Sequence, residues 1–125
     1  MKHSGKPAYQ ILVVDDESSV RDSIRMLLQY FGHTVQTADS GATALAMLSP
    51  DRFHLVITDY FMHGMKGDEL AAIIRQRLPG LPIIMATAFA DELKSSGKLE
   101  GNVDRVLIKP FTVAELNEAV AQVMG

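Results

Sequence analysis

Short apolar runs alternate along the chain with segments whose apolar residues recur every three or four positions. The runs at about 10–14, 53–58, 82–86 and 103–108 are rich in β-branched residues and predict buried strands. A fifth run, 33–38, alternates polar and apolar residues, as is typical of an edge strand. Helical spacing fills the intervals between these runs and the end of the chain. Ten alternating elements predict an α/β fold in which helices cover both faces of a parallel five-stranded sheet.

Capping signals mark the helix boundaries. Gly32 is expected to end the first helix in a left-handed conformation, and Ser40 is expected to cap the second. The third helix should begin near Gly67, and Thr112 opens a capping box for the last. The apolar positions of these helices are expected to face inward; in the last helix they are Val113, Leu116, Val120 and Met124.

The fourth helix is the weakest element of the pattern. Residues 91–100 contain few apolar positions, two serines and, in mid-segment, Gly97. A glycine inside a helix costs about 1 kcal/mol relative to alanine. We therefore expect this helix to be short, broken or mobile.

The connections favour one sheet topology. Right-handed crossovers and the strongly apolar strands at 10–14 and 53–58 predict a doubly wound sheet with the flavodoxin-like order 2-1-3-4-5. In such sheets the ligand site lies at the carboxyl ends of the strands.

Composition bounds the function further. The chain has 125 residues, 47% of them hydrophobic, and a net charge of −3, which gives no electrostatic case for binding nucleic acid. No cysteine is present, no apolar run could span a bilayer, and the first residues do not resemble a secretory signal. We expect one cytoplasmic domain over 1–125, with no membrane contact and with residues 1–8 as a flexible extension.

Polar residues follow the predicted strands at the edge where a ligand would bind. They are Asp15 and Asp16, Asp59, Thr87, and Lys109. Crowded carboxylates resist full ionisation unless cations offset them. Mg²⁺ together with the lysine would offset this charge, and Mg²⁺ favours a few oxygen ligands with retained water. The set therefore suits a divalent metal and a phosphoryl group.

The same residues carry a resemblance to a known family. The motifs are Val13-Val14-Asp15-Asp16-Glu17, Ile57-Thr58-Asp59 with Gly64-Met65-Lys66-Gly67, Ala86-Thr87-Ala88, and Ile108-Lys109-Pro110-Phe111. In this order and at these strand ends they make residues 9–125 similar to a response-regulator receiver domain of two-component signalling.

The resemblance implies a role for each residue. Asp59 would accept a phosphoryl group from a histidine kinase or histidine phosphotransfer protein, and Lys109 and Thr87 would hold that group. Asp16, Asp59 and the backbone carbonyl of Phe61 would ligate Mg²⁺, with Asp15 acting through water. The chain would then switch conformation for a downstream protein partner and lose the phosphoryl group slowly, without being a turnover enzyme. The Lys109–Pro110 bond is expected to be cis.

Several positions depart from the family pattern. Val106 stands where receivers commonly carry a tyrosine or phenylalanine that moves with Thr87, and valine cannot make that swing. Phe61 and Phe89 border the expected phosphoryl position and could shield it from water. His63 replaces a usual proline; we expect it to be an ordinary loop residue. Asn102 stands where the family often has glycine before the last strand, and we expect it to keep the left-handed turn, because asparagine is the next-best residue for that conformation.

Two other classes of protein share parts of the pattern. A flavin- or nucleotide-binding protein of this topology would want a phosphate-cradling loop after the first strand, where two aspartates stand instead. A Mg²⁺-dependent aspartyl phosphatase would usually place its nucleophile after the first strand, with a second aspartate two residues on. Asp15-Asp16-Glu17 lacks that spacing.

Overall fold

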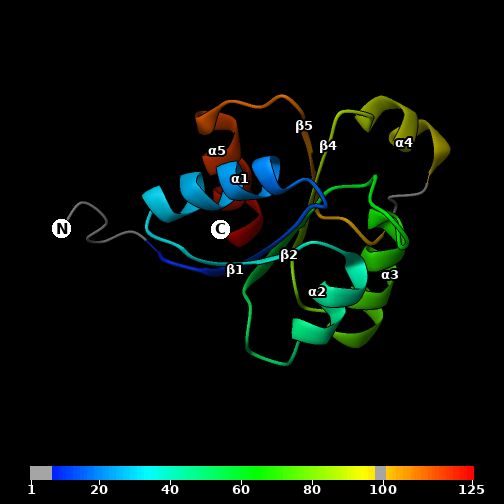
Figure 1. The fold of residues 1–125 in the computed structure, drawn as a ribbon, viewed down its shortest axis with the longest axis horizontal. Helices are drawn as coiled ribbons and strands as arrows, with labels where there is room; N and C mark the ends of the chain where they lie inside the picture. Colours follow the sequence, from blue (N-terminus) through cyan, green and yellow to red (C-terminus); the bar gives the residue numbers. More distant parts are fainter. Residues whose placement is uncertain (1–6, 98–100) are drawn as a thin grey trace.

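The computed structural model describes residues 7–97 and 101–125. Within them, strands and helices alternate throughout the chain (Figure 1). The elements are β1 Gln10–Val14, α1 Ser18–Tyr30, β2 Thr34–Ala38, α2 Gly41–Met47, β3 Leu55–Thr58, α3 Gly67–Arg77, β4 Ile83–Thr87, α4 Ala90–Ser96, β5 Arg105–Ile108 and α5 Val113–Met124. None of the helices in these two ranges is long and apolar enough to cross a membrane.

The five strands form one parallel sheet in the order β2-β1-β3-β4-β5. This confirms the predicted fold class and strand order. Strand β1 lies between β2 and β3, with Val13 opposite Thr37 on one side and Ile57 on the other. Because all strands run the same way, their carboxyl ends meet at one edge, where the polar residues follow.

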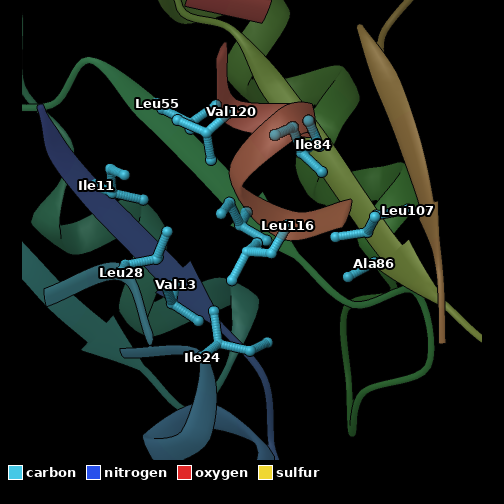
Figure 2. Close-up of a cluster of buried hydrophobic side chains, with 12 residues drawn as sticks. Ile11, Val13, Ile24, Leu28, Leu55, Ile84, Ala86, Leu107, Leu116 and Val120 are labelled. Atoms are coloured by element: carbon cyan, nitrogen blue, oxygen red, sulfur yellow. The ribbon is translucent and has the colours of Figure 1, made fainter. Parts of the chain in front are cut away.

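Alternate side chains of the strands enter two cores. Figure 1 shows α1 and α5 on one side of the sheet and α2 and α3 on the other. On the first side, Ile11 and Val13 pack with Leu28 of α1 and Leu116 of α5 (Figure 2). On the second, Leu12 and Val14 join a cluster that includes helix residues Ala44, Leu70 and Ile74. Burial on both faces explains why β1 and β3 are continuous apolar runs.

Helix α4 covers a third, smaller cluster. Leu93 packs there against Tyr60 and Met85, with Val103 and Val106 partly buried beside them. The helix is shorter than the predicted segment, because Gly97 does not lie mid-helix but ends it with a left-handed φ of 73°. The last three residues of the predicted segment, 98–100, lie outside the described residues, as do residues 1–6 of the expected extension.

Several local predictions can be compared with the structure. Gly32 has a φ of 96°, Ser40 caps α2, and Thr112 forms the expected capping box with Glu115. Two predictions are wrong. The side chain of Val113 is 44% exposed, because the first turn of α5 extends beyond the sheet-facing cluster that begins at Leu116. The left-handed turn before β5 is made by Gly101, with a φ of 78°, and not by Asn102, since glycine adopts that conformation at lower cost.

Candidate functional site

The backbone ladder continues past the strand ends and positions the polar residues. The N–H of Asp15 donates to Ala38, that of Asp59 to Val14, and that of Lys109 to Thr87, at 3.2, 3.0 and 3.0 Å. Each functional side chain therefore starts from a residue whose backbone is held by a neighbouring strand. The sheet brings together residues that are up to 94 positions apart in the sequence.

Lys109 joins two of the three carboxylates. Its Nζ lies 3.0 Å from Asp15 Oδ2 and 3.3 Å from Asp59 Oδ2. The Asp15 side chain is 3% exposed and that of Asp59 is 16% exposed, so both ion pairs are shielded from water. Shielded pairs of this kind are screened less by salt than surface pairs are.

The two partners have displaced pKa values. Burial raises the pKa of Asp59 above its ordinary value of 3.8, although the charge of Lys109 and a hydrogen bond from the Tyr60 N–H act in the opposite direction. Burial alone would lower the pKa of Lys109, but its hydrogen bond to Asp15 and its attraction to Asp59 outweigh this and raise it. Lys109 is therefore a permanent cation at neutral pH, held against a partly desolvated carboxylate.

Backbone N–H groups also donate to Asp59 and Thr87. Tyr60 N–H donates to Asp59 Oδ1 at 2.7 Å, and Phe89 N–H donates to the Thr87 hydroxyl oxygen at 3.1 Å. Thr87 is fully buried at the end of β4. Since Phe89 is the N-cap residue of α4, the Thr87 hydroxyl is bonded directly to the start of that helix.

Asp16 is held differently from the other two carboxylates. Its Oδ2 accepts the backbone N–H of His63 at 3.0 Å and lies 2.9 Å from His63 Nδ1. Sequence reasoning assigned His63 no part in the site, because a lone histidine in a loop has no ligand spacing. The only feature of the sequence that could have pointed to His63 is that it stands where the family usually has a proline.

The loop from Asp59 to α3 can take its path only with a glycine at position 67. A Cβ on Gly67 would overlap the carbonyl oxygen of Asp59 and lie 2.9 Å from the Cα of Tyr60. Its N–H also donates to the Tyr60 carbonyl at 2.8 Å. This close approach folds the loop back on the residue that carries the central carboxylate.

The rim of the site is aromatic. The Phe61 and Phe89 side chains are 46% and 47% exposed, and their rings meet edge to face. Phe61 also meets Tyr60 edge to face at 4.7 Å, and Lys66 Nζ lies 5.5 Å from the centre of the Phe61 ring. Tyr60 is buried in the cluster under α4 together with Val106.

The donor set is compatible with a magnesium ion. Within the described residues, no three His, Asp or Glu side chains are grouped closely enough to hold a metal by themselves. Mg²⁺ does not require such a cage, because it usually keeps several waters and takes one or two carboxylates. The carboxylates of Asp16 and Asp59 and the carbonyl of Phe61 are hard oxygen donors of that kind.

Comparison with known proteins gives a consistent result. The sequence model of the response regulator receiver domain matches residues 11–121. The chain is 38% identical to chemotaxis protein CheY-3 of Vibrio cholerae over 117 residues, which are 91% of this chain and 90% of that protein. It is also 38% identical to chemotaxis protein CheY of Pseudomonas aeruginosa, over 91% of this chain and 94% of that protein.

Solved structures show the same fold. Response regulator protein TrrA of Thermotoga maritima, in complex with Mg²⁺-BeF, superposes with a TM-score of 0.84 at 34% identity, covering 91% of this chain and 97% of that one. CheY4 of Vibrio cholerae superposes with a TM-score of 0.82 at 33% identity, covering 94% and 99%.

Proposed function

The chain belongs to the response regulator receiver domain family, and from this premise we propose that Asp59 accepts a phosphoryl group from the phosphohistidine of a kinase or phosphotransfer protein. The observation that carries the proposal is the position of Lys109 Nζ, within 3.3 Å of both Asp15 and Asp59 at the carboxyl edge of the sheet. Family membership alone would also apply to a receiver domain that had lost the ability to be phosphorylated. The position of Lys109 supports a domain that retains it.

Asp59 is suited to act as the nucleophile. In the proposed step an Asp59 oxygen forms a bond to phosphorus while the P–N bond to the donor histidine breaks, and its electron pair leaves with the imidazole. Asp59 Oδ1 is fixed by the Tyr60 N–H, whereas Oδ2 lies nearer Lys109. A desolvated carboxylate with a raised pKa is also a better nucleophile than a fully solvated one, provided that it is ionised.

Lys109 and Thr87 would hold the transferred group. The ammonium group can move from the carboxylates to a phosphoryl oxygen, because lysine carries three donors on a flexible stem. The Thr87 hydroxyl can donate to a second oxygen. Positioning and charge neutralisation are most of what phosphoryl transfer requires of a protein.

A metal would complete the site. Asp16, Asp59 and the Phe61 carbonyl would hold Mg²⁺, with Asp15 bonded to a metal-bound water. The ion would supply positive charge to the phosphoryl oxygens. TrrA, at 34% identity, has been solved with Mg²⁺-BeF, which supports this choice of ion.

The proposed output is a change of conformation and not turnover of a substrate. Receiver domains are signalling proteins, and we propose that residues 1–125 act as one such domain in the cytoplasm, contacting an upstream kinase and a downstream protein. A phosphatase remains the alternative reaction class. The two differ in product, because a receiver keeps the phosphoryl group on Asp59 for a time.

Incubation with acetyl phosphate and Mg²⁺, followed by mass spectrometry, tests the proposal. We expect a labile phosphoryl adduct on Asp59, absent in Asp59→Asn. Lys109→Met should reduce its formation about a hundredfold, as does loss of other charge-stabilising donors. Lys94→Met, an exposed lysine on α4, is the matched control. Steady release of phosphate without an adduct would instead favour the phosphatase.

A further inference from the structure

We propose that His63 is a positioning residue that holds Asp16 for the metal ion. The inference rests on the proposed function, in which Asp16 is a metal ligand. His63 is not one of the residues to which we assign phosphoryl transfer or metal ligation. It lies in the loop between β3 and α3.

The contact is directed at one oxygen of the carboxylate. Asp16 Oδ2 faces both the His63 backbone N–H at 3.0 Å and Nδ1 at 2.9 Å. Since an ionised carboxylate only accepts hydrogen bonds, Nδ1 must carry a proton in this contact. The two donors leave Oδ1 as the oxygen available to an ion.

Among the described residues, no group other than His63 holds the Asp16 side chain. Across residues 7–97 and 101–125, His63 is the only recorded hydrogen-bonding partner of the Asp16 side chain, whereas Asp15 and Asp59 share Lys109. The His63 side chain is fully exposed and that of Asp16 is 20% exposed. Without this contact the Asp16 carboxylate would sample several rotamers, and ordering it on ion binding would weaken the affinity.

The contact also joins two loops. Asp16 follows β1 and His63 lies 47 residues later, in the loop between β3 and α3. That loop carries the Phe61 carbonyl, another proposed ligand, and it is held against Asp59 by the close approach of Gly67. The contact with His63 therefore fixes the position of Asp16 relative to the two other proposed ligands, Asp59 and the Phe61 carbonyl. Groups that orient metal ligands in this way typically contribute 10- to 100-fold to affinity.

Substitutions at position 63 separate the two donors. His63→Ala removes the ring and keeps the backbone N–H, and His63→Pro removes both. His63→Asn keeps a side-chain amide that can donate where Nδ1 does. We expect the Kd for Mg²⁺, measured by isothermal titration calorimetry, to rise about tenfold in His63→Ala and further in His63→Pro. His63→Asn should restore it to within about threefold of the wild-type value.

Two further measurements distinguish a positioning role of His63 from direct ligation of the metal by its ring. The amide proton of residue 63 should exchange slowly in wild type and faster in Asp16→Ala, without any metal present. Titration with Ni²⁺, which favours imidazole, tests for direct ligation. An unchanged Mg²⁺ Kd in His63→Ala, or a loss of Ni²⁺ binding much larger than that of Mg²⁺, would overturn the positioning role. Failure of the wild-type protein to bind Mg²⁺ at all would count against the proposed function instead.

Discussion

The rings of Phe61 and Phe89 meet edge to face, with centroids 4.8 Å apart and planes at 80°. Phe61 follows Asp59 by two residues and Phe89 follows Thr87 by two, so the contact spans the loops after β3 and β4. Edge-to-face pairs contribute about 0.5–1.5 kcal/mol beyond the area they bury. The pair thus links the two loops that border the proposed phosphoryl position.

This aromatic rim should lengthen the life of the acyl phosphate. Replacing both rings, in Phe61→Asn with Phe89→Ala, opens the site to water, and we expect hydrolysis to accelerate about tenfold. The measurement is the decay of phosphoprotein after removal of the phosphodonor. Met26→Ala, at a 62% exposed position on α1, is the control. Equal decay rates for the double variant and the wild-type protein would contradict the prediction.

The signal should leave the site through α4. The Thr87 hydroxyl accepts the N–H of Phe89, so a phosphoryl oxygen that accepts a hydrogen bond from this hydroxyl is linked through it to the N-cap residue of α4. We expect the phosphoryl mimic beryllofluoride to slow amide exchange chiefly within residues 88–102. Exchange that is unchanged there, or that changes equally in α2, would show that the signal takes another route.

Tyr60 and Val106 share the cluster under α4, which makes a larger residue at position 106 costly. Tyr60 is 4% exposed and packs there with Met85 and Leu93. Val106→Phe, which restores the aromatic character common in the family, should overpack this cluster and lower the free energy of unfolding by about 1–3 kcal/mol. Urea denaturation measures the change, and Val106→Ile is the milder control. A gain in stability would mean that the cluster has room for a second ring.

The pH dependence of stability should reveal the burial of Asp59. Its pKa is raised on folding above 3.8, so the folded protein binds this proton more tightly than the unfolded chain does. Stability therefore falls as pH rises from the unfolded value through the higher folded one. We expect Asp59→Asn to be more stable than wild type at pH 7, by about 1 kcal/mol. The difference should shrink as pH falls through the raised folded value toward 3.8.

The control for this titration is Asp51→Asn, at an exposed carboxylate remote from the site. Parallel pH profiles for the wild-type protein and Asp59→Asn, measured by urea denaturation, would contradict the prediction. At alkaline pH Lys109 acts with the same sign, because its pKa is also raised on folding. Its raised pKa means that its stabilising contribution is present below 10.5 and is lost as pH rises through the folded value.

Gly67 should tolerate no side chain. Gly67→Ala places a Cβ against the Asp59 carbonyl, so the loop must move and take the central carboxylate with it. We expect a loss of about 2 kcal/mol in the free energy of unfolding and slower phosphorylation of Asp59. Gly80→Ala, where a Cβ would meet nothing within 4 Å, is the matched control. Equal behaviour of the two variants would show that the loop yields without effect.

Much of the fold could be predicted because its signals are local. The apolar runs of β1 and β3 and the caps at Ser40 and Thr112 depend on residues near each other in sequence, and the structure confirms them. The prediction that Val113 is buried is wrong, because helical spacing shows which face of the helix a residue lies on. It does not show how far the core extends along that face. Gly97 was read as a weakness inside a helix, whereas its backbone conformation makes it the end.

The sequence by itself determined the composition of the site. Four motifs after four predicted strands required Asp15, Asp59, Thr87 and Lys109 to reach one edge, because parallel strands in one sheet end together. Only the tertiary structure decided how these groups are paired. That Lys109 bridges Asp15 and Asp59 while Asp16 turns to His63 depends on rotamers and loop paths set by contacts across the sheet. Such contacts join residues far apart in the chain and leave no periodic signal within it.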